Sequence, residues 1–324
     1  MMKIRRLVLL FLLIVLMFAM VLACTRPVNR SAKSLQPVEE CRVVLHAVGE
    51  ACVPFDPQRI IVLGGGNTLG NLLAIGIKPI AASSGWNAIE PFPKHLQSQL
   101  EGVEYIGSTT QPSLEKILLH QPDLILANRH MEVFYDKLSQ VAATVVIDSD
   151  EPWKQQLLTL SEILDKEDVA SRLMNNYQQR IDELRQTLGD ERTELVVSVA
   201  TMTADFGIWA YGSKYPVSTV LDDIGVQRPL SQVGDFDYTG LISLEKLDII
   251  DGDLLFFVNR RSEDDNNSIS KVQESSLWKQ LKVVQNDRAY LVSLDHWYLD
   301  HSILGINAVL DDLFKYLIND HKLR

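Results

Sequence analysis

The sequence has few basic residues for its size. Its 31 Lys and Arg residues stand against 42 Asp and Glu residues, and the net charge is −11. A protein that binds nucleic acid needs a surplus of basic side chains to neutralise phosphates. A local basic patch can hide within such a total, but the composition argues against a general DNA-binding role.

The motifs of the common enzyme classes are also missing. The sequence has no P-loop, no G-x-S-x-G elbow, no H-E-x-x-H pair and no close group of cysteines, so the hydrolase and zinc-enzyme templates lack their defining residues. Gly64, Gly66 and Gly70 are spaced one residue too widely for the dinucleotide fingerprint.

A metal site built from histidines is a lesser alternative. The histidines that could converge on a metal are His46, His130, His296 and His301. They do not have the i, i+4 spacing of a helical metal site, and histidines at loop ends are more often solvated or hydrogen-bonded.

The length and composition are those of a globular protein with two cores. The chain has 324 residues, of which 46% are hydrophobic and 23% charged. These values exclude a single small module and a mainly disordered or fibrous chain.

The N-terminus has the pattern of a secretory signal. Three basic residues precede an apolar run at 7–23, and Cys24 follows directly after Ala23. A small residue before a cysteine resembles a bacterial lipobox, in which Cys24 becomes the lipid-modified first residue of a chain with a net charge of −14. The alternative is an uncleaved anchor, because the run is near the lower limit for a spanning helix. Both alternatives place the body of the protein outside the cytoplasm.

The other two cysteines, Cys41 and Cys52, are candidates for a disulfide in an exported protein. The residues between them predict a strand, a turn and the start of a second strand. Two free thiols remain possible, because the sequence does not determine the strand register.

The chain from residue 59 alternates between short apolar strands and helices. Strands are predicted at 59–63, 79–82, 123–127 and 144–147, and a first helix at 67–75. Continuous apolar runs separated by helices indicate parallel sheets covered on both faces. Two helices follow, at 153–164 and 168–188, and the second is about 30 Å long, enough to cross between lobes. Alternation then resumes at 194–200, 217–224, 253–258 and 289–293, before a closing helix at 303–318.

An internal repeat indicates two similar lobes. Ser113-Leu114-Glu115-Lys116 recurs 130 residues later as Ser243-Leu244-Glu245-Lys246, and both copies pass through an apolar strand into an Asn-Arg pair, at 128–129 and 259–260. We therefore expect two α/β lobes joined by the long helix, with a ligand in the cleft between them. The expected segments are a signal peptide (1–23), a tether (24–40), an N-terminal lobe (41–152), connecting helices (153–189) and a C-terminal lobe (190–324).

Aromatic and basic residues at predicted strand ends and loops are the candidate ligand contacts. They are Trp86, Arg129, Trp209, Tyr211, Tyr215, Tyr238, Arg260, Trp297 and Tyr298. Arginine suits carboxylate or hydroxamate oxygens, and aromatic rings suit a flat, partly apolar chelate. Several of these residues could instead pack in cores, and we expect about half to line the cleft.

Together these features resemble the ferric-siderophore and cobalamin class of ABC-transporter substrate-binding proteins. The resemblance is carried by the lipobox, the segment 57–63 (PQRIIVL), the paired Ser-Leu-Glu-Lys segments and the long helix, and it covers about residues 41–320. The segment 44–50 (VLHAVGE), leading to Val53-Pro54, is similar to the cyanobacterial iron-dicitrate and hydroxamate branch.

The resemblance implies a class III periplasmic-binding-protein fold and no catalysis. It implies a monomer without a cofactor, lipid-anchored at the periplasmic face of the inner membrane, that delivers an iron(III) chelate of the hydroxamate or citrate type to a permease dimer. Arg129 and Arg260 would neutralise the chelate, with Trp86, Tyr211, Tyr238 and Trp297 as walls, and Glu115 and Glu245 would dock on the permease. The alternatives are cobalamin or haem binding, or an extracytoplasmic enzyme or sensor domain on the same scaffold.

Overall fold

The structure, a computed structural model, describes residues 41–85, 91–202, 207–259 and 265–321, which belong to one compact unit that begins at Cys41. Trp86, Arg260 and Cys24 lie outside the described residues. None of the helices in this part of the chain combines the length and apolar character that a membrane crossing requires.

The first half of the unit is built on a six-stranded sheet with the order β6-β5-β4-β3-β7-β8. All neighbouring pairs are parallel except the short edge strand β6, which is antiparallel to β5. The central strands are apolar and buried throughout, as expected for a parallel sheet with both faces covered. The strands are β3 (Ile60–Leu63), β4 (Ala81–Ser84), β5 (Glu104–Ser108), β6 (Gln111–Pro112), β7 (Leu124–Asn128) and β8 (Ala143–Ile147).

The second half is built on a four-stranded sheet with the order β10-β9-β11-β12. Its strands are β9 (Val197–Met202), β10 (Ile208–Ala210), β11 (Leu254–Asn259) and β12 (Ala289–Ser293). Strand β11 is parallel to both of its neighbours, and only the edge strand β10 is antiparallel.

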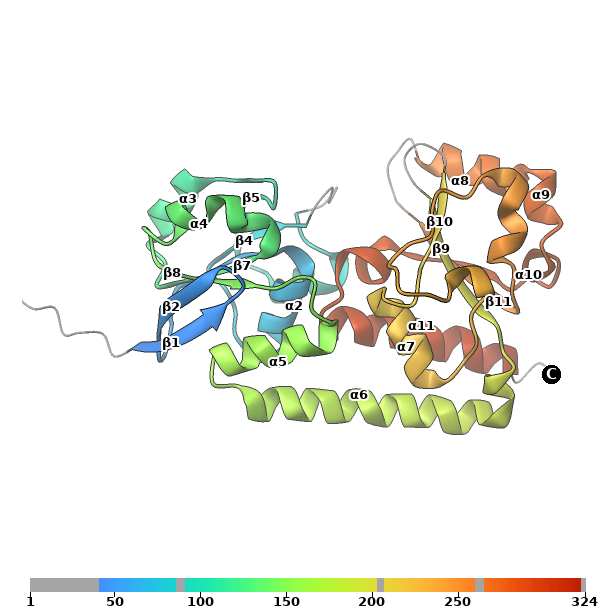
Figure 1. Cartoon of the computed structure of the whole chain (residues 1–324), viewed down its shortest axis with the longest axis horizontal. Helices are drawn as coiled ribbons and strands as arrows, with labels where there is room; N and C mark the ends of the chain where they lie inside the picture. The colour runs from blue at the N-terminus through green and yellow to red at the C-terminus, as the bar shows by residue number, and fades with distance from the viewer. Residues whose placement is uncertain (1–40, 86–90, 203–206, 260–264, 322–324) are drawn as a thin grey trace, which may run out of the picture. The chain divides into compact units, whose positions relative to one another are not determined.

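Helices surround the two sheets (Figure 1). The α-helices are α2 (Gly65–Ala74), α3 (Leu114–His120), α4 (Tyr135–Leu138), α5 (Trp153–Ile163), α6 (Glu167–Leu188), α7 (Pro216–Ile224), α8 (Asp265–Glu274), α9 (Ser276–Lys279), α10 (Lys282–Gln285) and α11 (Ile303–His321). Short 3-10 turns are η1 (Lys94–Gln99), η2 (Arg129–Phe134), η3 (Gly189–Thr193), η4 (Leu230–Gln232) and η5 (Leu244–Ile250), and η6 (Asp295–Leu299) is a π-helical turn.

The long helix α6 connects the two halves. Its buried stripe includes Tyr177, Ile181 and Leu184, at the three- and four-residue spacing of one helix face. This stripe packs on α5 of the first half and on α7 and α11 of the second, along which α6 runs in Figure 1. The helix ends at Gly189, whose φ of 62° favours glycine. The structure therefore confirms two α/β lobes bridged by one long helix.

The repeated sequence has a structural counterpart in both sheets. Asp123, just before β7, accepts hydrogen bonds from the backbone N–H groups of Gln58 (2.7 Å) and Arg59 (2.9 Å). Asp253, just before β11, accepts one from Val196 N–H (3.0 Å). In each half the repeated aspartate thus ties the central strand to the start of its neighbour.

A two-stranded hairpin precedes the first sheet. Strands β1 (Cys41–His46) and β2 (Gly49–Pro54) are antiparallel, and a disulfide joins Cys41 to Cys52, whose Cα atoms are 5.4 Å apart. The register pairs Val43 with Cys52, which places both cysteines on the exposed face. The Ala47 N–H donates to the Val146 carbonyl at 3.1 Å, which connects the hairpin to β8.

Candidate functional site

The first part of the candidate site is an open pocket at the carboxyl edge of the six-stranded sheet. Because β5 and β7 run in the same direction in this sheet, the loops that follow them lie at the same edge. The pocket has a volume of about 330 Å³, and its lining residues are Thr109, Thr110, His130, Val133 and Phe134.

The lining combines two hydroxyl groups and an imidazole with an aromatic and an aliphatic side chain. Such a mixture suits a ligand with polar oxygens on a partly apolar frame. Sequence reasoning missed four of these residues and considered His130 only as a metal ligand. The segment before Thr109 and Thr110, 104–108 (EYIGS), has no continuous apolar run, and threonine is too common in loops to point to a ligand by itself.

Arg129 follows β7 but is not among the residues that line this pocket. Its guanidinium Nη1 lies 3.0 Å from the carboxylate of Asp148 and 3.6 Å from that of Asp150. Both aspartates follow the C-terminal end of the neighbouring strand β8. The hydrogen bond and charge of Asp148 raise the pKa of Arg129 above its usual value. The arginine is therefore exposed and already paired with two carboxylates.

The second part of the site is a cluster of aromatic rings in the second half of the chain. The ring centroids of Tyr211 and Tyr215 are 4.0 Å apart, those of Tyr215 and Tyr238 5.0 Å, and those of Trp209 and Tyr238 5.5 Å. Tyr211 and Tyr215 are buried, whereas Trp209 and Tyr238 are partly exposed. Burial raises the pKa of Tyr215 well above its ordinary value, with contributions from Tyr211, Tyr238 and Tyr298. The cluster is therefore uncharged at neutral pH.

Trp297 has a different environment from the one expected of a cleft wall. Its ring is fully buried and stacks on Phe256 at a centroid distance of 4.8 Å. Its Nε1–H donates to Asp312 at 2.8 Å. In this structure Trp297 is a core residue, because burying its large ring against the second sheet stabilises the fold. The adjacent Tyr298 is partly exposed.

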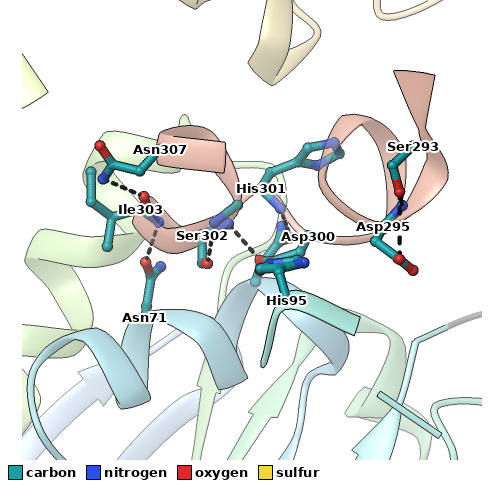
Figure 2. A network of polar contacts seen from close by, with 11 residues as sticks. Asn71, His95, Ser293, Asp295, Asp300, His301, Ser302, Ile303 and Asn307 are labelled. Atoms are coloured by element: carbon teal, nitrogen blue, oxygen red, sulfur yellow. Dashed lines mark hydrogen bonds and ion pairs between the residues drawn. The ribbon is translucent and has the colours of Figure 1, made fainter. Parts of the chain in front are cut away.

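The two halves meet where α2 contacts the segment that precedes α11 (Figure 2). Asn67 accepts a hydrogen bond from the His301 backbone N–H at 2.7 Å, and Asn71 accepts one from Ile303 N–H at 2.9 Å. A side chain at Gly66 would collide with the Leu299 carbonyl oxygen, its Cβ lying 2.4 Å away. Gly66 therefore permits close packing between the halves.

His301 is held at this junction next to the aromatic cluster. Its ring points away from the Asp300 carboxylate in Figure 2 and lies edge-on to Tyr215, with centroids 4.9 Å apart. Burial lowers the pKa of His301 to about 4, although Asp300 and the Trp297 backbone act in the opposite direction. The imidazole is therefore neutral at physiological pH, and its buried Nε2 has no hydrogen-bond partner among the residues that the structure describes.

The start of α2 connects the pocket with the aromatic cluster. A Cβ atom at Gly65 would lie 3.7 Å from the Thr109 methyl group, so the helix begins beside the pocket. Two residues later, Asn67 accepts a hydrogen bond from the backbone N–H of His301, whose ring contacts Tyr215. The pocket and the aromatic cluster therefore both lie near the N-terminus of α2, although their residues are about 100 positions apart in the sequence.

The four candidate histidines have different partners. His46 contacts the Tyr135 hydroxyl at 3.3 Å, His296 contacts Asp312 at 2.8 Å, His130 lines the pocket and His301 packs on Tyr215. Among the residues that the structure describes, no group of three or more His, Cys, Asp or Glu side chains has the arrangement of a metal site.

The two glutamates of the repeat are exposed on different local structures. Glu115 lies in the first turn of α3, where the Ser113 hydroxyl caps the helix by accepting from Lys116 N–H at 3.4 Å. Glu245 lies in η5, which is interrupted at Lys246, and a hydrogen bond from Ser243 lowers the pKa of its carboxyl.

Comparisons with known proteins agree with this architecture. The family model for periplasmic binding proteins matches residues 60–293. The probable siderophore-binding lipoprotein YfiY of Bacillus subtilis is 31% identical over 319 residues, covering 95% of this chain and 97% of the relative. The achromobactin-binding periplasmic protein of Dickeya dadantii is 32% identical over 270 residues, covering 80% and 86%.

Solved structures show the same fold. The crystal structure of Staphylococcus aureus SirA complexed with staphyloferrin B superposes with a TM-score of 0.74 at 24% identity, covering 85% of this chain and 98% of that one. Because the family model matches most of the chain and relatives of 31% and 32% identity cover it, this chain belongs to the periplasmic binding protein family. This is a family of substrate-binding proteins and not of enzymes.

Proposed function

We propose that this protein is the extracytoplasmic substrate-binding component of an ABC importer and that its ligand is a ferric siderophore. Two relatives with about 30% identity are named for siderophore or achromobactin binding. The observation that carries the proposal is the open pocket, lined by hydroxyl, imidazole and aromatic groups, beside a partly exposed aromatic cluster. We favour an iron(III) chelate of the hydroxamate or citrate type, held without a resident cofactor.

The pocket supports binding and not conversion of the ligand. His130 is exposed and Thr109 is buried beside α2, and the aromatic cluster is uncharged. These groups can donate to and accept from chelate oxygens and pack against ligand carbons. The unpartnered Nε2 of His301 adds one buried acceptor behind Tyr215.

We also propose that Glu115 and Glu245 dock the two lobes on a permease dimer. Both carboxylates are exposed, and each belongs to one copy of the repeat. A favourable interaction with the helix dipole is an alternative role for an acid in a first turn, worth about 0.3–1 kcal/mol. That alternative explains Glu115 in α3 better than Glu245 in a short, interrupted turn. Two like charges on one rigid body would orient it on a two-fold partner.

The proposed location is the periplasmic face of the inner membrane, with the monomer anchored through a lipid on Cys24. The support is the lipobox-like sequence, in agreement with relatives that are named lipoproteins. The folded unit begins at Cys41, so residues 24–40 are available as a tether.

A binding panel tests the proposed ligand. The full-length protein is titrated with ferric schizokinen, aerobactin, ferrichrome and dicitrate, and with haem and cobalamin, while Trp emission and the charge-transfer absorption are recorded. We expect saturable quenching by at least one ferric siderophore and none by its iron-free form. Saturation by haem or cobalamin alone would replace the proposed ligand, and no saturation by any member would reject the siderophore-binding proposal.

A further inference from the structure

The exposed face of α3 combines the docking carboxylate with two leucines. Glu115, Leu118 and Leu119 are exposed, whereas Ile117 is fully buried in the core of the first half. Positions i, i+3 and i+4 share one helix face, and the side chain of Leu119 is 76% exposed. The carboxylate therefore lies at the edge of an apolar surface.

The second docking segment has the same combination from different sequence positions. Leu241, 67% exposed, and Leu244 precede Glu245 on the same stretch of chain. Leu230, on η4, is 91% exposed. The Ser231 hydroxyl donates to the Ile249 carbonyl at 2.5 Å, which connects η4 to the C-terminal end of η5.

Leu244 belongs to the repeat and matches Leu114, but the repeat does not explain Leu118, Leu119 or Leu241. The residues equivalent to Leu118 and Leu119 in the second copy are Asp248 and Ile249, and Ile249 is partly buried. Apart from Leu244, the exposed leucines near the two glutamates are therefore at positions that the repeat does not share. Neither Glu115 nor Glu245 has a salt bridge to another described residue. Exposed leucines around an unpaired carboxylate are unfavourable in water unless a partner covers them.

We propose that the two segments are mixed docking faces, in which Leu118 and Leu119 accompany Glu115, and Leu241 and Leu244 accompany Glu245. The proposed partner is the permease dimer, with a basic side chain inside an apolar depression on each subunit. The inference rests on the proposed function. The leucines would bury apolar surface on contact and exclude water from around the glutamates. A carboxylate in a site without water interacts more strongly with a cation, so the glutamates would orient the complex.

The test uses the full-length lipoprotein with the purified permease in proteoliposomes, and it measures the lipoprotein density that gives half-maximal stimulation of the permease ATPase. The test variant is Leu119→Ser with Leu241→Ser. The matched control is Leu45→Ser with Leu291→Ser, which removes one exposed leucine from β1 and one from β12. We expect the required density to rise about 10- to 100-fold for the test variant and to stay within about twofold for the control.

A third variant separates this inference from the docking role of the glutamates. Glu115→Lys with Glu245→Lys should abolish stimulation at every salt concentration, whereas the leucine variant should keep the salt dependence of the unmodified protein. Loss with the glutamate variant and no change with the leucine variant would overturn the mixed docking faces alone. No change with either variant would overturn both the leucine inference and the proposed docking role. Ligand affinity, measured in parallel, should be the same in all variants.

Discussion

His95 and Asp300 are 205 positions apart in the sequence, and the His95 Nε2 lies 2.7 Å from the Asp300 carboxylate. Asp300 is completely buried, and its other carboxylate oxygen accepts from the Ser302 backbone N–H at 2.8 Å. The contact connects η1 of the first half with the segment before α11 (Figure 2). It lies beside the two asparagines that hold the same segment to α2.

Replacing His95 should destabilise the protein without removing the ligand site. In His95→Ala one oxygen of a buried carboxylate loses its partner, so we expect the free energy of unfolding to fall by about 1–3 kcal/mol. His95→Gln keeps a donor and should recover part of the loss. Urea unfolding measures both variants, and equal midpoints for the unmodified protein and His95→Ala would contradict the contact.

His301 should make stability depend on pH. Its folded-state pKa of about 4 is below the unfolded value of 6.5, so the unfolded chain binds the proton more readily between these pH values. The contribution is therefore complete above about pH 6.5 and is lost as the pH falls toward 4, by at most about 3 kcal/mol. Thermal unfolding from pH 7.5 to 4 measures this slope. His301→Gln should have a shallower slope, and an unchanged slope would assign the pH dependence to other groups.

Opening the disulfide should destabilise the hairpin and spare the ligand site. Cys41 and Cys52 are 11 residues apart, and the bridge lies on the outer face of β1 and β2. Constraining a loop of this length is worth about 2–3 kcal/mol. Cys41→Ser with Cys52→Ser should lower the unfolding free energy by about this amount. A large loss of ligand affinity would show that the hairpin supports the site.

Replacing Arg129 tests whether its guanidinium contacts the ligand although it already forms ion pairs with Asp148 and Asp150. If the guanidinium reaches an anionic chelate, Arg129→Ala should weaken binding about 10- to 150-fold in the fluorescence titration. If pairing with Asp148 and Asp150 is its only role, affinity will not change, because exposed ion pairs contribute little. Lys137→Ala, an exposed basic residue on α4, is the control.

Cys24→Ser tests the lipid anchor. Acylation requires the thiol, so the variant should be soluble or unprocessed while its ligand affinity is intact, because Cys24 precedes the folded unit. Metabolic lipid labelling and fractionation measure this. Lipid labelling that persists in Cys24→Ser would assign the anchor to another position.

The architecture could be predicted from the amino-acid sequence, because the signals for it are local and periodic. Short apolar runs such as 60–63 and 124–127 favour buried strands of a covered sheet, and the three- and four-residue spacing that continues through Tyr177, Ile181 and Leu184 favours an amphipathic helix. The repeat at 113–124 and 243–254 indicated two related lobes, and both repeated aspartates have the same role at a strand start.

Which side chains come together in the candidate site depends on the folded arrangement of the chain. Trp297 and Tyr298 are adjacent in sequence, yet one is a core residue beneath Phe256 and the other is partly exposed. The pocket brings together residues that follow β5 and β7. The His301 backbone is held by Asn67, and the His301 ring contacts Tyr215 of the aromatic cluster. Composition and spacing identify candidates for binding, but the direction of a side chain depends on long-range packing that no local pattern encodes.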